Sequence, residues 1–500
     1  MHSLAINTIS NYAGKIYAGL IGIVVLPMFL KLMGPESYGL IGFFTLMQGW
    51  MQLLDLGMSP TLGREIARLK ESKNSTFQLK SIVKTFETVF VIVAIFIVIV
   101  IFVAGDWIST SWLNLENIDK GITVDSIKLM GVIVGLRWVS SLYRSGINAY
   151  EAQVWLGAID IIFSTLKFPG ALILMMIYSG NVVYFFIYQL LIAAIESFIL
   201  ARKLNSLVPA ATTAIPYFSF KELKRIAPFS LGLAYTSGIW VMTTQLDKLL
   251  LSNILTLQNF GYFSLVVSIA SGITALSSPI GSVILPRMTA LLARQQETEM
   301  LILYNESSRL VVCIIAPVTA MLSIYSKELV YAWTGSIEAA KWAEPILPYY
   351  VLGNGLLAII SFQYYLQYVH GRLKWHIIYN SAYAVIVIPI LFFVVTESGA
   401  HGAGIFWLIC QIFTFVFWIP FVHHKFAPNL HFKWFLFNFI LPATVGSIII
   451  LLFYFILPIS EFSERINIAV KLVFMGIVGV LGAILISFIG RIKKLIFVLI

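Results

Sequence analysis

The hydrophobic pattern of this 500-residue chain predicts membrane-spanning helices along almost its whole length. Fourteen apolar segments are each long enough to cross a bilayer, which takes about 20 helical residues. They run over residues 8–32, 38–62, 82–104, 122–147, 153–178, 181–203, 226–250, 258–285, 308–333, 343–369, 375–396, 401–422, 434–457 and 466–489. The gaps between them have at most about 20 residues, too few for a soluble catalytic domain. The sequence therefore predicts an all-α polytopic membrane protein with about 14 transmembrane helices.

An internal repeat indicates how these segments are grouped. Tyr38-Gly39 at the start of the second segment matches Phe260-Gly261 at the start of the eighth, and the basic stretch 64–69 matches 286–291. Both matches are separated by 222 residues, or six segments. A repeat after six spans keeps its orientation in the membrane, which predicts two parallel six-helix lobes around a central cavity.

The same grouping predicts four parts of the chain. The predicted parts are an N-terminal six-helix lobe at 1–204, a cytoplasmic linker at 205–225, a C-terminal six-helix lobe at 226–424 and two peripheral accessory helices at 425–500. Within the linker, Ser219-Phe220-Lys221-Glu222 has the pattern of a capping box and predicts a short basic helix along the membrane interface.

Composition excludes a soluble protein. The chain is 59% hydrophobic and only 11% charged, whereas soluble domains have roughly 25% charged residues. Its net charge of +10 could indicate nucleic acid. Lys and Arg, however, concentrate in alternate loops, as in the cytoplasmic loops of membrane proteins. We therefore expect no nucleic acid partner, and we expect both termini in the cytoplasm, with the N-terminal apolar stretch retained.

Known sites for metals and cofactors are missing from the sequence. Cys313 and Cys410 both lie in apolar runs, which favours packing over a disulfide or a metal pair. We find no phosphate-binding loop, no His-Glu-x-x-His pair and no Cys-x-x-Cys pair. The sequence therefore predicts no cofactor and no metal site.

The second segment carries a polar row on one helix face. Thr45, Gln48, Gln52, Asp55 and Ser59 recur at spacings of three and four residues. A carboxylate inside hydrocarbon costs several kcal/mol unless it faces protein or water. The pattern predicts that this face looks into a hydrated space, and that Gly57 and Pro60 loosen the helix near its end.

Five further segments carry similar rows. They are Asn7, Asn11 and Lys15; Arg137, Ser141, Arg144 and Asn148; Asp160, Ser164 and Lys167; Thr236, Trp240, Thr243 and Asp247 with Lys248 beside it; and Ser264, Ser268, Ser271, Ser278 and Ser282. The tenth segment ends with Gln363, Gln367 and His370.

Two interpretations of these rows stay open. Small and amide side chains can simply let helices approach and hold together. The ionisable residues Lys15, Asp55, Arg137, Asp160 and Lys167 favour a hydrated transport path, because charges inside a membrane are expensive elsewhere.

Ion pairing is the alternative for some of these charges. Asp55 could pair with Lys15 or Arg137, and Lys167 could extend outward to the membrane surface. For Arg144 and Glu196, which lie near the ends of their segments, we expect a place at the interface.

The stretch 34–68 also carries a family resemblance. Its pattern is Gly34-Pro35-Glu36-x-Tyr38-Gly39-Leu40, then Gln48-x-Trp50, then Leu53-Leu54-Asp55-Leu56-Gly57-Met58-Ser59-Pro60-Thr61, then Arg64-Glu65-x-Ala67-Arg68. This pattern resembles the start of bacterial O-antigen flippases, in the multidrug/oligosaccharidyl-lipid/polysaccharide exporter superfamily. The resemblance implies a multi-pass protein of the bacterial inner membrane that moves an undecaprenyl-diphosphate-linked repeat unit to the periplasmic face. Membrane lipids, and the polymerase and chain-length proteins of the same pathway, would be its partners.

The polar residues of the segments suit such a cargo, which would cross by alternating access between the two lobes. Arg and Lys suit a diphosphate, and neutral amides suit a glycan. The predicted substrate cavity consists of Lys15, Arg137, Lys167, Asn11, Gln48 and Gln52. Asp55 and Asp247 are the candidates for coupling to H⁺ or Na⁺.

Three other functions remain as alternatives. A multidrug exporter of the same superfamily would favour acidic and aromatic cavity residues, whereas the first lobe has three cations and two acids inside its segments. A glycan polymerase or ligase would need a large loop or a soluble domain. A scaffold protein of the cell envelope would not need charges within the membrane.

Overall fold

The computed structural model describes the backbone of residues 2–70, 76–208, 218–459 and 464–499. Within these ranges it describes all side chains except those of 2–13, 15, 16, 52, 229 and 489–499. The described chain is helical, and its single β-type pairing is an isolated bridge between Asn114 and Thr256. The predicted all-α class is therefore confirmed.

The chain forms two compact units, Met1–Gly261 and Tyr262–Ile500. Unit 1 contains α1 (His2–Met33), α2 (Pro35–Leu54), α3 (Met58–Leu69), α4 (Thr76–Trp107), η1 (Ile108–Trp112), α5 (Lys120–Ala149), α6 (Gln153–Thr165), η2 (Leu166–Gly170), α7 (Ala171–Ile177), α8 (Val182–Leu207), α9 (Phe220–Ile254) and the start of α10 (Leu257–Ala293). The elements η1 and η2 are short π-helices. The division of the sequence into four parts stays a prediction.

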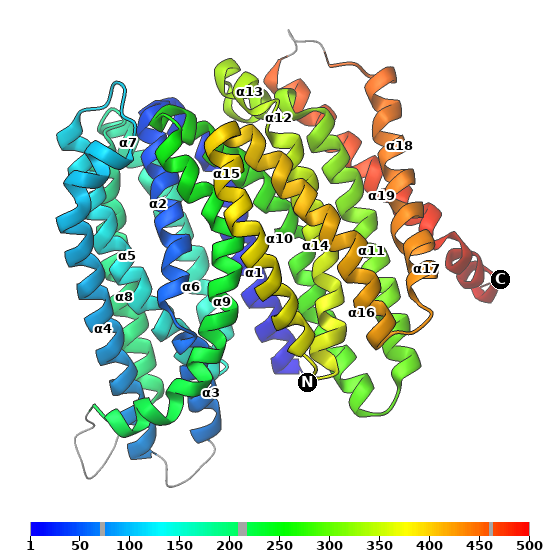
Figure 1. Cartoon of the computed structure of the whole chain (residues 1–500), viewed down its shortest axis with the longest axis horizontal. Coiled ribbons are helices and arrows are strands. Elements are labelled where there is room, and N and C mark those ends of the chain that lie inside the picture. Colours follow the sequence, from blue (N-terminus) through cyan, green and yellow to red (C-terminus); the bar gives the residue numbers. More distant parts are fainter. Residues whose placement is uncertain (1, 71–75, 209–217, 460–463, 500) are drawn as a thin grey trace. The chain divides into compact units, whose positions relative to one another are not determined.

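Unit 2 contains the rest of α10 and the helices that follow it. They are α11 (Glu297–Ile324), α12 (Ser326–Thr334), α13 (Ile337–Ala343), α14 (Leu347–Val369), α15 (Lys374–Phe413), η3 (Thr414–Trp418), α16 (Ile419–Phe426), α17 (His431–Trp434), η4 (Phe435–Ile440), α18 (Leu441–Ile456) and α19 (Arg465–Leu499). Figure 1 labels the α-helices of both units.

Among the described residues, eight helices are long and apolar enough to span a membrane by length and composition. The number is nine if α13 and α14, which meet at a bend of 60°, form one span. The protein is thus a multi-pass membrane protein. Fourteen spans remain a prediction, since the polar helices α2, α5 and α9 are not among the eight.

One of these eight stretches, 374–426, is long enough for two crossings. Its 53 residues would extend for about 80 Å as a straight helix, against a hydrocarbon core of about 30 Å. The backbone breaks at Gly399, whose φ of 56° suits glycine, and α15 turns back on itself (Figure 1). The two arms contact each other, because Tyr379 donates a hydrogen bond to Thr414 at 2.8 Å and stacks on Trp418.

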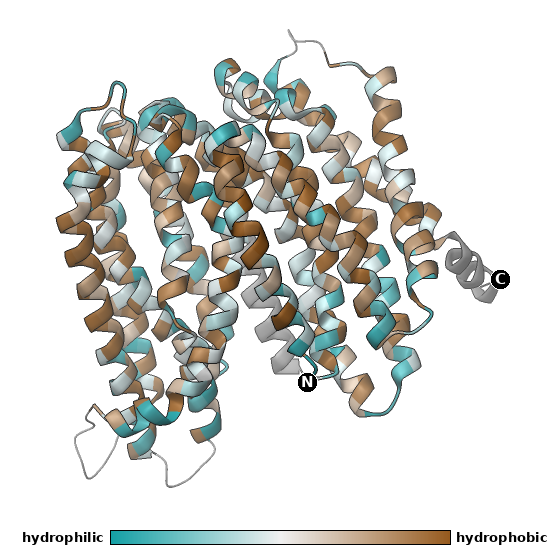
Figure 2. Cartoon of the chain, in the orientation of Figure 1, coloured by the Kyte–Doolittle hydropathy of each residue, from teal (hydrophilic) through white to brown (hydrophobic). Residues whose placement is uncertain are grey.

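Helix α4 shows why these helices belong in a bilayer. Phe86 and Phe90 on one side are at most 1% exposed, whereas Phe96 and Val103 on the other side are 65% and 78% exposed. Both sides are apolar, and most of α4 is coloured hydrophobic in Figure 2. An apolar face without protein cover is expected where lipid is the solvent.

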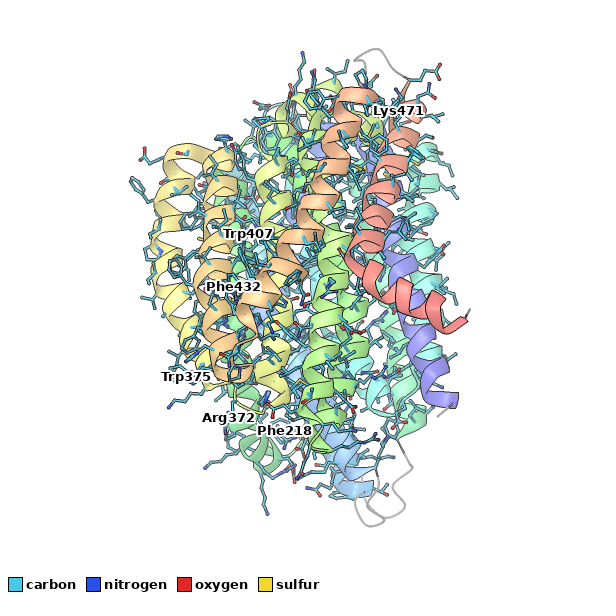
Figure 3. All side chains as sticks on the ribbon, turned by 90° about the vertical axis from the view of Figure 1, so that its right-hand side faces the viewer. Phe218, Arg372, Trp375, Trp407, Phe432 and Lys471 are labelled. Carbon is cyan, nitrogen blue, oxygen red and sulfur yellow. The ribbon has the colours of Figure 1, made fainter. Side chains whose placement is uncertain are left out.

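Unit 2 shows the same arrangement along its length. Arg372 and Trp375 lie at one end of this unit and Lys471 at the other, with Trp407 between them (Figure 3). Charged residues at both ends, with Trp375 beside Arg372 at one of them, are typical of a membrane-embedded unit, because Trp is enriched at the membrane interface.

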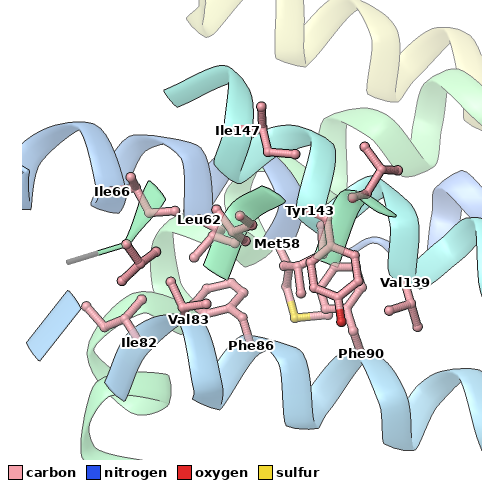
Figure 4. Packing of buried hydrophobic residues seen from close by; sticks show 14 of the residues in the cluster. Met58, Leu62, Ile66, Ile82, Val83, Phe86, Phe90, Val139, Tyr143 and Ile147 are labelled. Atoms are coloured by element: carbon pink, nitrogen blue, oxygen red, sulfur yellow. The ribbon is translucent and has the colours of Figure 1, made fainter. Parts of the chain in front are cut away.

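The core of unit 1 is an apolar cluster shared by α3, α4, α5, α6 and α8 (Figure 4). Phe90 stacks on Trp138 with ring centroids 4.7 Å apart, and the Trp138 indole donates to the Phe90 carbonyl at 3.2 Å. Leu62 and Leu142, from α3 and α5, have no exposed surface. This core fixes α5 and α8, which carry the site described below.

The two glycines of the internal repeat meet inside unit 1. A Cβ atom on Gly39 would lie 2.1 Å from the Leu257 carbonyl oxygen, and one on Gly261 would lie 2.6 Å from the Pro35 carbonyl oxygen. The repeat offset of 222 residues relates Pro35 to Leu257 and Gly39 to Gly261, so the two contacts are equivalent. Backbone meets backbone here, and no side chain fits between the first turns of α2 and α10.

We predict that Gly39→Ala lowers the free energy of unfolding by about 1–3 kcal/mol, because the added methyl group must push two backbones apart. Gly49→Ala in the same helix is the matched control, since its Cβ would meet only the flexible Gln245 side chain at 3.5 Å. Thermal unfolding of the purified protein in detergent measures both effects. Equal melting temperatures for the two variants would contradict the close crossing.

Candidate functional site

Helices α5 and α8 pack against each other and carry two matching pairs of polar residues. Arg137 donates from Nη2 to Gln189 Oε1 at 3.1 Å, and Arg144 donates from Nη2 to Glu196 Oε1 at 2.6 Å. Both pairs are 52 residues apart in sequence, so the two helices run in the same direction. The seven-residue step within each helix puts both pairs on one face.

Glu196 is the centre of an ion-pair network. Its carboxylate is 3% exposed and also accepts from Lys167 Nζ at 2.5 Å. Arg144 in turn donates from Nη1 to Asp160 at 2.5 Å. The two carboxylates thus join α5, α6, η2 and α8. A buried carboxylate is stable only when such partners compensate for lost hydration.

Arg137 lies in a different environment. Its Nη1 donates to Gln48 of α2, its Nη2 donates to Gln189, and its Nε is buried without a partner. The guanidinium also lies over the Phe44 ring, 5.0 Å from the centroid. No carboxylate in the described part of the chain forms an ion pair with Arg137.

Gln189 also donates from Nε2 to the Lys167 carbonyl at 2.8 Å, which joins Arg137 to the network around Glu196. The cluster formed in this way carries an excess of positive charge. It contains three cations, Arg137, Arg144 and Lys167, and two carboxylates, Asp160 and Glu196. Among the described side chains the formal charge is +1, and Arg137 is the cation of this set that forms no ion pair. Such a site can bind an anionic group, since a guanidinium matches the geometry of phosphate oxygens.

The structure brings together three of the six residues predicted for the substrate cavity. Gln48, Arg137 and Lys167 belong to one cluster. The side chains of Lys15, Asn11 and Gln52 are not among those described.

Two of the alternatives that the sequence left open are contradicted. Lys167 does not extend outward, because it pairs with buried Glu196. Asp55 does not pair with Arg137, and its carboxylate contacts Ser59 instead. Arg144 and Glu196 pair with each other, and their place near the membrane interface stays a prediction.

Asp247, the second residue predicted for ion coupling, lies on α9. It is 6% exposed, and its carboxylate contacts Lys248 Nζ at 3.2 Å. Its predicted role in ion coupling stays a prediction.

The polar face of 38–62 is interrupted near Gly57, where the sequence predicted a loosening, and the single helix expected from spacing is in fact two helices. Helix α2 ends at Leu54, and α3 begins at Met58 after Leu56 and Gly57 adopt positive φ angles. Asp55 Oδ2 accepts from the Ser59 backbone N–H at 3.2 Å, and Oδ1 accepts from the Ser59 hydroxyl at 2.5 Å. Asp55 thus satisfies a free N–H at the start of α3, which is a structural role.

Glu36 explains part of the motif that begins at Gly34. Gly34 adopts a φ of 81°, Pro35 begins α2, and Glu36 follows in the first turn. The Glu36 carboxylate is 7% exposed and accepts from the backbone N–H groups of Glu116, Asn117 and Ile118 at 2.7–3.2 Å. This motif therefore fastens the loop after η1 to α2, a function that spacing in the sequence did not indicate.

Comparison with known proteins supports a role in glycan biology. The family described as "Polysaccharide biosynthesis protein" matches residues 29–344. A protein of Shigella flexneri with the name "Putative O-antigen transporter" is 22% identical over 413 residues, which cover 81% of this chain and 94% of that protein.

Solved structures share the fold. The lipid II flippase MurJ in its inward closed conformation aligns with a TM-score of 0.75 and 14% identity, covering 97% of this chain and all of that chain. A multidrug resistance MATE family transporter of the MOP superfamily, in an inward-facing conformation, aligns with a TM-score of 0.63 and 14% identity, covering 84% of this chain and 99% of that one. At these identities the similarity concerns the fold alone.

We predict that Asp55→Ala lowers the free energy of unfolding by about 1 kcal/mol, because the start of α3 loses its acceptor. Asp55→Asn keeps an acceptor of similar strength, so its stability stays within a few tenths of a kcal/mol of the wild type. Thermal unfolding in detergent compares the two variants. A loss of the same size in both would show that the negative charge, and not the capping bond, stabilises this turn.

Proposed function

The chain belongs to the polysaccharide biosynthesis protein family, and on this basis we propose that it flips an undecaprenyl-diphosphate-linked oligosaccharide repeat unit across the inner membrane. The family match includes residues 34–68 and confirms the resemblance that their motif indicated. The cargo would move from the cytoplasmic to the periplasmic face for O-antigen or another surface polysaccharide.

The observation that carries this proposal is the unpaired charge of Arg137. A lipid-linked oligosaccharide combines an anionic diphosphate with a neutral glycan. Arg137 offers a charged fork for phosphate oxygens, and its Nε–H has no partner among the side chains that the structure describes. Gln48 lies beside it with an amide that can hydrogen-bond to hydroxyl groups.

The similarity to flippases and exporters supports a transport mechanism without enzymatic chemistry. We propose an architecture of 14 spans in two six-helix lobes and two further helices, with both termini in the cytoplasm. The lobes move by alternating access. The lipid tail stays in the bilayer while the head group crosses. Polymerase and chain-length proteins of the same pathway would receive the product.

Coupling to H⁺ or Na⁺ is part of the proposal, with Asp55 and Asp247 as candidates. Asp55 has a capping role that Asp55→Asn preserves, so this variant separates the two functions. Full transport by Asp55→Asn at every pH and sodium concentration would exclude Asp55 as the coupling residue.

A multidrug exporter is the second candidate, because the fold is also that of MATE transporters. An exporter of cationic drugs needs acidic groups in its cavity. The cluster around Arg137 has the opposite excess of charge, which favours the anionic cargo.

We predict that Arg137→Ala reduces transport of the lipid-linked repeat unit at least tenfold, which corresponds to the loss of one charged hydrogen bond of about 1.5–3 kcal/mol. Arg137→Lys keeps the charge without the fork and should retain part of the activity. The measurement is complementation of a gene deletion in the host, with mass spectrometry of the lipid-linked units on each membrane face.

Arg202→Ala is the matched control, because Arg202 lies on α8 with an exposed side chain over Phe198. It should restore surface polysaccharide fully. Accumulation of repeat units on the outer face of the deletion strain would instead indicate a polymerase or ligase. Unchanged glycans and precursors would favour the drug exporter.

A further inference from the structure

The two pairs between α5 and α8 have the same geometry but a different chemistry. Each pair consists of an arginine on α5 and a residue two methylene groups long on α8 that accepts its Nη2 hydrogen. Glutamate at 196 neutralises Arg144, whereas glutamine at 189 leaves Arg137 charged. The carbon skeletons of the two acceptors are identical, so only the charge differs between the pairs.

A carboxylate in place of the Gln189 amide could also accept hydrogen bonds from Arg137. Gln189 is 4% exposed, and the Nε of Arg137 beside it is buried without a partner. A carboxylate at this position could bind both Nε and Nη2 in a bidentate pair. Buried arginines are usually paired in this way, because an unpaired buried charge is costly.

We propose that Gln189 determines the specificity of the site by orienting Arg137 without neutralising it, so that an anionic group of the cargo becomes its counter-ion. This inference rests on the proposed function, in which the cargo carries a diphosphate. Gln48 on α2 also orients Arg137 without neutralising it, because its neutral amide oxygen accepts a hydrogen bond from Arg137. Two neutral acceptors hold the guanidinium in place, and its charge stays available.

A purely structural role for Gln189 leads to different expectations. Its Nε2 donates to the Lys167 carbonyl at 2.8 Å, so the amide also joins α8 to η2. If this contact were its whole function, losing the amide would matter and adding a charge would not. Both Gln189→Met and Gln189→Glu lose the donor to the Lys167 carbonyl, so a purely structural role predicts equal effects. Gln189→Glu differs because it keeps an acceptor for Arg137 and adds a negative charge.

The experiment measures binding of undecaprenyl diphosphate to the purified full-length protein in nanodiscs, with undecaprenol as the neutral control lipid. We expect Gln189→Glu to weaken binding of the diphosphate at least tenfold, and Gln189→Met to weaken it less than threefold. Binding of undecaprenol should be the same in all variants. Melting temperatures show whether each variant is folded.

A double variant separates the total charge of the cluster from the charge of Arg137 alone. Q189E/E196Q has the formal charge of the wild type, because the carboxylate moves from one pair to the other. We expect it to bind the diphosphate as weakly as Q189E, because the carboxylate at position 189 neutralises Arg137 while the cations that lose their partner are Arg144 and Lys167. If the double variant binds within about threefold of the wild type, the total charge of the cluster and not the free charge of Arg137 determines binding, and the inference is wrong.

A carboxylate at position 48 would also neutralise Arg137, without placing a new charge at the buried position 189. Gln48 is only half-buried, so Gln48→Glu tolerates a new charge better if Gln189→Glu does not fold. It should also weaken diphosphate binding at least tenfold. Equal weakening by Gln189→Glu and Gln189→Met, or no weakening by Gln48→Glu, would overturn the role assigned to the glutamines. If the wild type itself prefers neither lipid, the anionic cargo of the proposed function fails.

Discussion

The polar site of unit 1 depends on one buried carboxylate. Glu196 is 3% exposed and lies between the charged ends of Lys167 and Arg144. A carboxylate without water is costly, and two cations at 2.5–2.6 Å compensate for it. The two cations come from η2 and α5, and Glu196 lies on α8. Separating any of these three segments would leave a buried charge unpaired, so the ion pairs stabilise one arrangement of all three. Arg137 can remain charged beside them because the neighbouring charges are already balanced among themselves.

Apolar packing and the polar site perform separate tasks in this unit. The cluster around Phe90 and Trp138 sets the spacing of α4 and α5, while the outer side of α4 is left apolar for lipid. In a bilayer, lipid competes with protein for apolar surface, so close packing and internal hydrogen bonds must specify which helices are neighbours. The backbone contact at Gly39 and Gly261 and the carboxylate of Glu36 are two such specifying contacts.

The sequence could predict the helices and the polar faces, because both follow from hydrophobicity and a period of 3.6 residues. Arg137 and Lys167 were found in this way, since charges within apolar segments are conspicuous. Their partners could not be found, because pairing depends on which helices are neighbours. Gln189 and Glu196 look like ordinary residues of α8 until α5 is packed against it. Gly57 indicated that the helix loosens near this point, whereas the φ of 45° at Leu56 and the complete break after Asp55 could not be predicted from the sequence.

Lys167 contacts α8 in two ways, and this has a mechanical consequence. Its ammonium group binds Glu196, and its backbone carbonyl accepts from Gln189, two helical turns away on the same face. Two contacts at different heights of α8 oppose both rotation and sliding of η2 better than one contact would. They therefore fix the direction of the η2 segment as well as its position, so that the Lys167 ammonium group meets Glu196 at one height of α8.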